Sequence, residues 1–234
     1  MPPLIDAHRG ECGRPGLSAA DRYRFAVALG VDFVEIDIRR TTDGVFVNYH
    51  DDYTPSRRPV RNLSYTELEG ELGDELVRVE DLVGVIDGKS GLHVDVKEEG
   101  YEPDIVRFIK ARFRHSELVF TSGDDPIRAI KERFPDVRTG LSLGDDLDGA
   151  PPWRYVQVRL GELFPGKRLR RSLADFAAVH QRLARIRVLD HCARAQMPAW
   201  VWTVDEEERI ASFMRDPRVA VLITNRPDIA MRFR

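Results

Sequence analysis

The chain has 234 residues, of which 42% are hydrophobic and 32% charged, and 36 Lys and Arg against 39 Asp and Glu leave a formal net charge of −3. This composition excludes a disordered chain, because the apolar content suffices for a core and the net charge is small. No apolar run approaches the ~20 residues of a membrane-spanning helix, so no transmembrane segment is expected. The absence of excess positive charge argues against nucleic acid as a partner.

The cysteine content and the first residues indicate the cellular compartment in which the protein is expected. Cys12 and Cys192 are too few for the disulfide framework of a small secreted domain, and their spacing indicates no zinc site. The start of the sequence lacks the basic residues and the apolar stretch of a signal peptide. We therefore expect free thiols, a reducing compartment and a cytoplasmic protein.

Short β-branched or apolar runs alternate with segments of helical periodicity along the chain. The runs that predict strands are Leu4–Ala7, Phe33–Ile38, Leu92–Val96, Leu118–Thr121, Val137–Leu141, Phe176–His180, Trp200–Thr203 and Val219–Ile223. Strand alternating with helix implies a parallel sheet, and eight repeats imply that the sheet closes into a (β/α)₈ TIM barrel. Such barrels run to ~250 residues as one unit, so we expect a single domain over residues 1–234.

Several intervening segments carry signals for helix ends. Ser18 precedes the helical segment Ala19–Leu29, and Gly30 follows it as a stop. Asp205 followed by Glu208 predicts a capping box at the start of a later helix.

The region 144–175 is the most ambiguous part of the chain. The residues with helical spacing there are Trp153, Val156, Leu160 and Leu163. Tyr155–Val158 alternatively reads as a short strand. We predict the fifth helix in this region, because that assignment keeps the number of strands at eight.

Residues 39–91 depart from simple alternation and predict an insertion after the second strand. Asp43-Gly44 is typical of a turn between Asp37–Arg40 and Val45–Tyr49, and a loop rich in proline and arginine follows. An insertion at this point rises over the carboxyl ends of the strands, where the active sites of barrels lie.

Charged side chains alternate with apolar ones in the second and third strands. The apolar residues are expected to pack on the outer helices, so Glu35 and Asp37 point into the barrel. The same alternation directs His93, Asp95 and Lys97 to the interior face of the next strand. Two neighbouring strands therefore bring three carboxylates and one ammonium to one confined mouth.

Three carboxylates in such a mouth need compensating charge, since an unpaired buried ion costs several kcal/mol. Lys97 compensates one of the three, and a divalent cation compensates the other two. Carboxylates with water form the oxygen-rich site that suits Mg²⁺ or Ca²⁺. The alternative is a surface strand pair with a solvated charged face, but alternation in both strands favours the barrel interior.

Two histidines are candidates for proton transfer. Asp6-Ala7-His8-Arg9-Gly10 ends the first strand, where Arg9 can bind a phosphate through its planar fork and Gly10 permits a sharp turn. His50 is followed by Asp51, which can orient the imidazole ring. A lone histidine is usually structural, but two beside a carboxylate cluster favour an acid/base pair.

Other candidates stay open at this point. Trp202 shares a face with Trp200 and is either barrel core or a wall of the substrate site. His180, at the end of the sixth strand, is equally ambiguous. The basic run at 168–171 reads as a solvated helix end.

Short motifs follow one another in a characteristic order over nearly the whole chain. They are His8-Arg9-Gly10, Glu35-x-Asp37, Asp43-Gly44, His50-Asp51, Asp95-x-Lys97, Trp202-Thr203-Val204 and Thr224-Asn225-x-Pro227. In this order the sequence resembles the glycerophosphodiester phosphodiesterase family of TIM barrels.

The resemblance implies a metal-dependent enzyme that hydrolyses glycerophosphodiesters to sn-glycerol 3-phosphate and an alcohol, with a small-molecule phosphodiester as its partner. The implied roles are a divalent cation (Mg²⁺ or Ca²⁺) on Glu35, Asp37 and Asp95, acid–base catalysis by His8 and His50, and substrate or phosphate binding by Arg9, Lys97 and Trp202. The metal is expected to polarise the phosphoryl oxygens. The neighbouring glycerol hydroxyl is expected to attack first, giving a cyclic phosphate that water opens.

The sequence departs from the family pattern at three places. Gly16–Ala19 stands where Pro-Glu-Asn-Thr is usual, Asp95 is shorter than the usual Glu, and Asp6 replaces a commonly apolar residue. The pair Asp95-x-Lys97 is also similar to that of lysophospholipase D and sphingomyelinase D-like barrels, so a lysophospholipid is the alternative substrate. A barrel that has lost catalysis and only binds a phosphorylated ligand is the alternative outside enzymes.

Overall fold

The computed structural model of the chain describes residues 2–144, 158 and 161–234. The strands in this part are β1 (Leu4–Ala7), β2 (Phe33–Arg40), β3 (Phe46–Asn48), β4 (Val77–Arg78), β5 (Gly91–Val96), β6 (Leu118–Ser122), β7 (Arg138–Leu143), β8 (Phe176–His180), β9 (Ala199–Trp202) and β10 (Val219–Thr224). They form one sheet in the order β1-β10-β9-β8-β7-β6-β5-β2-β3-β4. The additional pairing of β1 with β2 closes eight parallel strands into a barrel.

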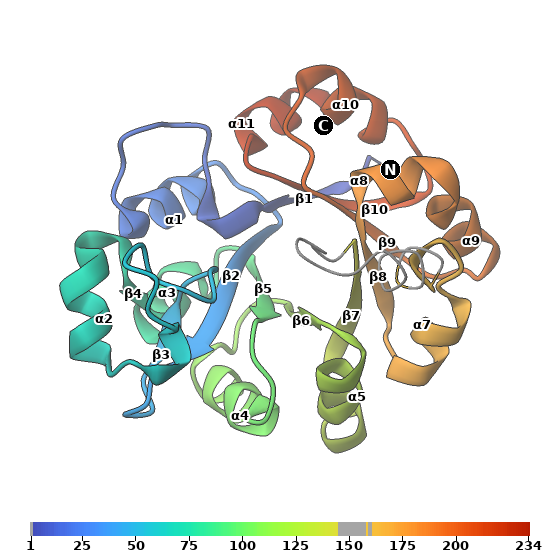
Figure 1. Cartoon of the computed structure of the whole chain (residues 1–234). Helices are drawn as coiled ribbons and strands as arrows, with labels where there is room; N and C mark the ends of the chain where they lie inside the picture. The colour runs from blue at the N-terminus through green and yellow to red at the C-terminus, as the bar shows by residue number, and fades with distance from the viewer. Residues whose placement is uncertain (1, 145–157, 159–160) are drawn as a thin grey trace.

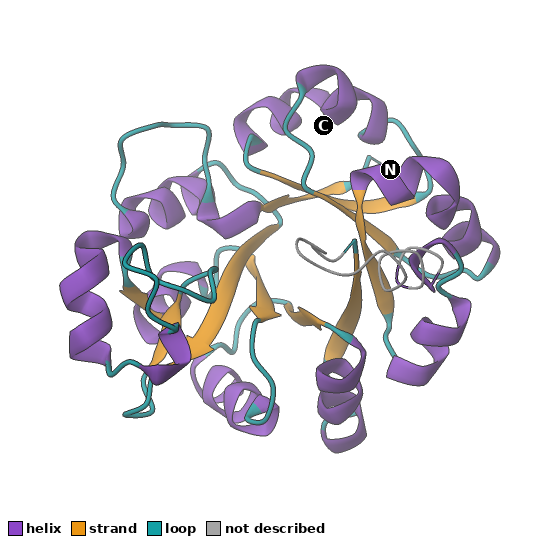
Figure 2. Cartoon of the chain, in the orientation of Figure 1, coloured by secondary structure: helices purple, strands orange, loops and turns teal. Residues whose placement is uncertain are grey.

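Helices surround this barrel on the outside (Figure 1, Figure 2). They are α1 (Ala19–Ala28), α2 (Tyr65–Leu72), α3 (Val79–Ile86), α4 (Glu102–Arg112), α5 (Asp124–Arg133), α7 (Gly166–Ser172), α8 (Gln181–Leu183), α9 (Leu189–Arg194), α10 (Glu207–Phe213) and α11 (Pro227–Ala230). The predicted TIM barrel is thus confirmed, with all eight strands found. No helix in these described ranges has the length and apolarity needed to cross a membrane.

The strands of the barrel end close to their predicted bounds. β1 and β8 match the prediction residue for residue. β2 runs two residues further than predicted, to Arg40, because its last residues pair antiparallel with β3. That extension carries the inward-facing alternation one position beyond Asp37, to Arg39.

The segment after β2 forms a small extension of the sheet. β3 pairs with the end of β2, β4 pairs with β3, and α2 covers them with an apolar cluster of its own. The predicted turn at Asp43-Gly44 is present, with Gly44 at a φ of +85°. The predicted insertion 39–91 also contains α3, which packs against α1 and the barrel strands as an ordinary barrel helix. The added structure therefore lies between the end of β2 and β4.

Two of the predicted helix ends are confirmed and one is wrong. The Ser18 hydroxyl accepts a hydrogen bond from the backbone N–H of Asp21 at 3.2 Å, and Gly30 has a φ of +76°. Asp205 does not cap α10, whose N-cap residue is Glu206 without a side-chain cap. The Asp205 carboxylate instead accepts hydrogen bonds from Asn225, because the pairing of β9 with β10 brings the loops after these strands together.

The predicted helix over 144–175 falls in part on 145–157 and 159–160, outside the described residues, as do Trp153, Val156, Leu160 and most of Tyr155–Val158. In the described remainder, residues 161–163 are helical, and α7 follows.

Cys12 and Cys192 are buried free thiols.

Two apolar layers restrict inward-facing polar side chains to one end of the barrel. The first, between strands and helices, contains Val34, Ile36 and Ile38, as their alternation predicts. The second fills the barrel around Trp200, whose ring stacks on Phe176 with centroids 4.4 Å apart. Because these large rings occupy the interior near the amino ends of the strands, inward-facing polar groups collect at the carboxyl ends.

Candidate active site

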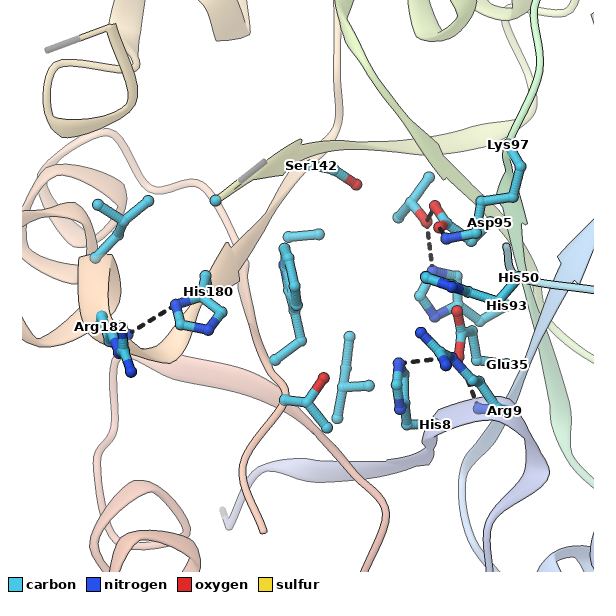
Figure 3. A pocket seen from close by; sticks show the side chains of 17 residues that line it. His8, Arg9, Glu35, His50, His93, Asp95, Lys97, Ser142, His180 and Arg182 are labelled. Carbon is cyan, nitrogen blue, oxygen red and sulfur yellow. Dashed lines mark hydrogen bonds and ion pairs between the residues drawn. The ribbon is translucent and has the colours of Figure 1, made fainter. Parts of the chain in front are cut away.

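A cavity of about 700 Å³ opens at the carboxyl ends of the barrel strands (Figure 3). The predicted site residues that line it are His8, Arg9, Glu35, His50, Asp95, Lys97 and Trp202. The eighth, Asp37, is buried and contacts two of these residues, Arg9 and Lys97. The fold thus assembles every residue that the sequence analysis selected for the site.

Three carboxylates converge on one side of this cavity. Glu35, Asp37 and Asp95 each offer an oxygen, and these atoms lie within 4.8 Å of one another. The reason lies in the sheet register, because β2 pairs with β5 so that Asp37 stands opposite Asp95 and Glu35 opposite His93. Side chains at paired positions of neighbouring strands share a face, which makes the cluster a consequence of register.

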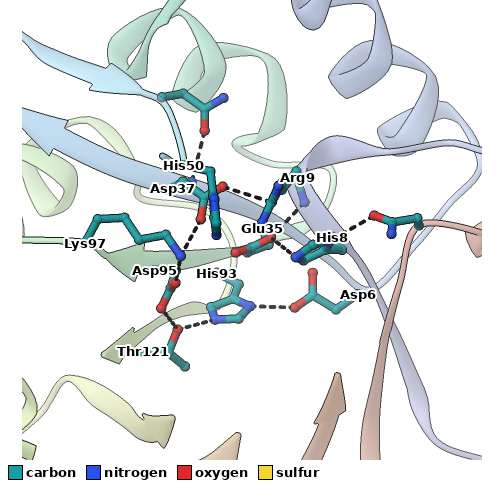
Figure 4. Close-up of polar contacts among 12 residues, drawn as sticks. Asp6, His8, Arg9, Glu35, Asp37, His50, His93, Asp95, Lys97 and Thr121 are labelled. Carbon is teal, nitrogen blue, oxygen red and sulfur yellow. Dashed lines mark hydrogen bonds and ion pairs between the residues drawn. The ribbon is translucent and has the colours of Figure 1, made fainter. Parts of the chain in front are cut away.

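Two cations contact the cluster (Figure 4). The Lys97 ammonium lies 2.9 Å from a carboxylate oxygen of Asp37 and also pairs with Asp95. The Arg9 guanidinium lies 3.4 Å from Asp37, and the Arg9 backbone N–H donates to Glu35 at 2.7 Å. Asp37 therefore lies within 4 Å of two cations, whereas Glu35 accepts a hydrogen bond from a backbone N–H and lies 3.8 Å from Nε2 of His8.

This difference appears in the pKa values of the carboxyl groups. Burial and the nearby charge of Asp37 raise the pKa of Glu35 to about 8. Burial also acts to raise the pKa of Asp95, but Lys97 and a hydrogen bond from Thr121 outweigh it and hold that pKa at about 2. One carboxyl group of the cluster is thus short of positive charge at neutral pH. An all-oxygen donor set with this deficit fits a hard divalent cation.

A series of buried hydrogen bonds connects Asp95 to Asp6 through Thr121 and His93. The Asp6 carboxylate lies 2.6 Å from His93 Nδ1, His93 Nε2 lies 2.7 Å from the Thr121 hydroxyl, and that hydroxyl donates to Asp95 at 2.7 Å. Burial alone would lower the pKa of His93, but Asp6 outweighs it and raises that pKa. Alternation along the strand predicts that His93 faces the interior, but it does not predict a contact with Asp6, because the two residues lie 87 positions apart in the sequence.

The turn after β1 presents His8 and Arg9 to the cavity. Arg9 has a φ of 52° and Gly10 one of +65°, a conformation in which glycine is favoured. A Cβ atom at Gly10 would also lie 2.5 Å from the ring of buried Tyr23. The sharp turn expected from the His-Arg-Gly motif is present, and its glycine is required by both φ and packing.

His8 has one ring nitrogen bound and one facing the cavity. Its Nδ1 lies 2.7 Å from the side-chain oxygen of Asn225, and its Nε2 lies 3.8 Å from Glu35, beyond hydrogen-bond distance. Burial, followed by the neighbouring charge of Arg9, lowers the pKa of His8. A neutral imidazole with a free Nε2 is the form that accepts a proton.

His50 enters the cavity from the loop after β3. Its Nδ1 lies 2.7 Å from the Asp51 carboxylate, the partner expected from the sequence. Burial, followed by the charge of Lys97, lowers the pKa of His50. The His50 carbonyl oxygen accepts a hydrogen bond of 2.8 Å from Arg39, whose side chain is only 4% exposed. Arg39 was missed in the sequence, although it continues the inward alternation that selects Asp37.

His180 lies across the cavity from the carboxylates (Figure 3), and Trp202 also lines the cavity. Their rings meet nearly at right angles, at 79°, with centroids 5.2 Å apart. Trp202 therefore lines the cavity, whereas Trp200 belongs to the barrel core. The basic run at 168–171 lies on α7, where Arg170 and Arg171 are exposed, as a solvated helix end predicts, whereas Arg168 is 22% exposed and pairs with Asp124.

Residues 8–122 match the Glycerophosphoryl diester phosphodiesterase family. The chain is 23% identical over 254 residues to a glycerophosphodiester phosphodiesterase of Caldanaerobacter subterraneus, an alignment that covers 97% of this chain and 96% of the relative. It is 24% identical over 230 residues to a glycerophosphodiester phosphodiesterase of Arabidopsis thaliana, covering 88% of this chain and 66% of that protein.

Solved structures share the barrel. A phosphodiesterase from Oleispira antarctica, in complex with the product sn-glycerol-3-phosphate, superposes with a TM-score of 0.76 at 20% identity, covering 99% of this chain and 96% of the other. A glycerophosphodiester phosphodiesterase from Parabacteroides distasonis gives a TM-score of 0.76 at 16% identity, covering 98% and 95%.

The fold, the carboxylate cluster and these relatives define a phosphoric diester hydrolase built on a TIM barrel. The matched region includes both histidines, all three carboxylates, Arg9 and Lys97. The chain is thus similar to the glycerophosphodiester phosphodiesterase family over residues 8–122, and to two of its curated members over most of its length.

Proposed function

We propose that this chain is a metal-dependent phosphodiesterase that hydrolyses glycerophosphodiesters to sn-glycerol 3-phosphate and an alcohol, with His8 and His50 transferring protons. The observation that carries the proposal is the convergence of Glu35, Asp37 and Asp95 in the cavity that both imidazoles line. The product seen in the Oleispira structure supports glycerol 3-phosphate as one half of the substrate.

A divalent cation, Mg²⁺ or Ca²⁺, is held in this proposal by the three clustered carboxylates. The support is the raised pKa of Glu35, which reflects its burial and the nearby negative charge of Asp37. When bound, the cation supplies a Lewis acid that polarises a phosphoryl oxygen and stabilises developing charge. Arg9 and Lys97 line the same side of the cavity and bind the phosphate by their positive charge.

Proton transfer follows from the hydrogen bonds of the two rings. His8 Nδ1 is held by Asn225, so His8 Nε2 takes the proton of the glycerol hydroxyl that attacks phosphorus. The bond from phosphorus to the alcohol oxygen then breaks, and His50 donates a proton to that oxygen. Asp51, bound to His50 Nδ1, favours the charged imidazole that this transfer requires and so opposes the lowering of the His50 pKa by burial and Lys97.

The second half of the reaction opens the cyclic phosphate. His50, now neutral, takes a proton from water while the water oxygen bonds to phosphorus. His8 returns its proton to the glycerol oxygen as the ring bond breaks. One water is consumed, and both imidazoles regain their starting protonation, so the cycle balances.

The test is release of sn-glycerol 3-phosphate from glycerophosphocholine and glycerophosphoethanolamine, with added Mg²⁺ or Ca²⁺ and with chelator. We expect chelator to abolish release and His8→Ala to lower it by about 100-fold or more. His115→Ala is the matched control, because His115 lies at the opposite end of the barrel on Asp87. Activity that is unaffected by chelator or survives His8→Ala would contradict this mechanism.

A lysophospholipid is the second candidate substrate. Leu183 and Ile223 line the cavity together with Trp202, so apolar groups as well as polar ones are available to the leaving half of the substrate. A panel that includes lysophosphatidylcholine, with choline release as readout, distinguishes the two substrates. Faster turnover of the lysophospholipid would favour the second candidate.

A further inference from the structure

Two side chains outside the catalytic set form a chain of hydrogen bonds that ends on His8. Asp205 lies in the loop after β9, and its carboxylate accepts the backbone N–H and the side-chain NH₂ of Asn225, each at 2.8 Å. The side-chain oxygen of Asn225 lies 2.7 Å from His8 Nδ1. Because β10 pairs with both β9 and β1, three segments remote in sequence meet at this point.

The position of Asp205 determines which way the Asn225 amide faces. An ionised carboxylate only accepts hydrogen bonds, so the NH₂ group of Asn225 must face Asp205. A flipped amide would place its oxygen against the carboxylate and its NH₂ against His8. With the backbone N–H of Asn225 bound to the second oxygen, the carboxylate is held in the orientation that excludes the flip.

The Asn225 oxygen in turn determines the tautomer of His8. An amide oxygen accepts hydrogen bonds, so His8 Nδ1 must carry the proton. In the neutral ring, Nε2 then holds the free lone pair. Nε2 lines the cavity side of the ring and lies 3.8 Å from a carboxylate oxygen of Glu35.

We propose that Asp205 and Asn225 are positioning residues that hold His8 in the tautomer able to accept a proton at Nε2. The inference rests on the proposed role of His8 as a base, and it assigns Asp205 a task although it contacts neither the cavity nor the carboxylate cluster. The structure of α10 agrees, because that helix begins without a side-chain cap while the nearby Asp205 is engaged with Asn225.

Asp205→Asn tests the orientation step directly. The amide introduced at position 205 still accepts from the backbone N–H of Asn225, but its NH₂ then faces the NH₂ of Asn225. Asn225 relieves that contact by flipping, which presents its NH₂ to His8 Nδ1 and moves the ring proton to Nε2. We expect kcat to fall about 10- to 100-fold while KM stays within about 2-fold.

The exchange variant Asp205→Asn/Asn225→Asp provides the rescue. In it, the amide at position 205 donates to the carboxylate at position 225, whose second oxygen accepts from His8 Nδ1. Asn225→Asp alone places two carboxylates face to face and is expected to lose activity. We therefore expect the double variant to recover most of the kcat that each single variant loses.

The readout that separates positioning from stability is the ¹⁵N NMR spectrum of ¹⁵N-histidine-labelled protein at about pH 8, where a histidine of lowered pKa is neutral. His8→Gln identifies the His8 signals. We expect protonated Nδ1 in the unaltered protein and in the exchange variant, and protonated Nε2 in Asp205→Asn.

Asp87→Asn is the matched control. Asp87 also accepts backbone N–H groups and contacts a histidine nitrogen, that of His115, but at the amino end of the barrel. We expect Asp87→Asn to change stability without changing kcat or the His8 tautomer. An Asp205→Asn protein with unchanged tautomer and kcat would overturn the inference. If the unaltered protein releases no glycerol 3-phosphate but Asp205→Asn still shifts the His8 tautomer, the proposed function is refuted and the positioning role of Asp205 and Asn225 stands.

Discussion

Asp95 stands directly opposite Asp37 in the parallel pairing of β5 with β2, and Lys97 pairs with both. Lys97 and Arg9 together compensate the two carboxylates of that pair, and Glu35 adds a further negative charge when it ionises. The cluster is therefore built to bind additional positive charge.

Asp37→Asn separates metal binding from folding. The substitution removes a ligand oxygen, so we expect Mg²⁺ or Ca²⁺ affinity to fall about 10-fold or more. It also relieves like-charge crowding around Glu35, so the free energy of unfolding of the metal-free protein should change by less than about 1 kcal/mol. Calorimetric titration with each cation measures the first effect and urea unfolding the second. Unchanged affinity in the titration would remove Asp37 from the ligand set.

The raised pKa of Glu35 predicts how pH affects the metal-free protein. A folded-state pKa of about 8, above the ordinary 4.5, contributes stability that is complete below about pH 4.5 and is lost as pH rises through 8. A bound dication prefers the ionised form and offsets this loss. We therefore expect the increase in Tm on adding Mg²⁺ or Ca²⁺ to grow between about pH 6 and pH 9.

Glu35→Gln is the control for this pH effect. The amide does not titrate, so the variant should lack the part of the stability loss that occurs near pH 8. Thermal unfolding of both proteins across the pH series makes the comparison. The same decline in the variant and in the unaltered protein would show that another group is responsible.

Gly10→Ala should destabilise the fold strongly. The added Cβ meets the ring of Tyr23 at 2.5 Å and adopts a φ of +65°, so we expect a loss of about 2 to 4 kcal/mol in the free energy of unfolding. Gly16→Ala is the matched control, because Gly16 has a φ of +78° with nothing within 4 Å of its Cβ position. The control should cost only about 1 to 2 kcal/mol. Equal losses in denaturant unfolding would show that Tyr23 yields without cost.

Arg39→Met should weaken the attachment of the loop that carries His50. Arg39 donates to the His50 carbonyl and pairs with Asp52 and Glu98. Without it we expect faster amide hydrogen exchange at residues 50–52 and about a 10-fold lower kcat. Arg40→Met serves as the control, since the Arg40 side chain is 39% exposed and points to Asp104. Unaltered exchange in the Arg39 variant would mean that the loop is held by other contacts.

Much of the fold and the metal cluster could be predicted from local sequence patterns. A strand that is apolar at alternate positions assigns every other side chain to the interior, so Glu35, Asp37, His93, Asp95 and Lys97 were placed on the correct face before their neighbours were known. Eight such strands alternating with helices left a closed barrel as the expected arrangement.

Other parts of the site depended on which strands became neighbours. Alternation assigns a face, but not the partner across that face, so the contact of Asp6 with His93 could not be predicted. Asp205 is a second example. Its spacing to Glu208 fits the local pattern of a capping box, but in the structure Asp205 does not cap α10. Its actual partner, Asn225, is 20 residues away.

Local patterns determined the strands, their inward faces and the acidic residues at their ends, since backbone geometry repeats over a few residues. Barrel closure decided the hydrogen bonds to His8 and His93, since β1 meets β10 and β2 only once the sheet has closed. A hydrogen bond requires two groups within about 3 Å, and only the complete register of the strands sets that distance.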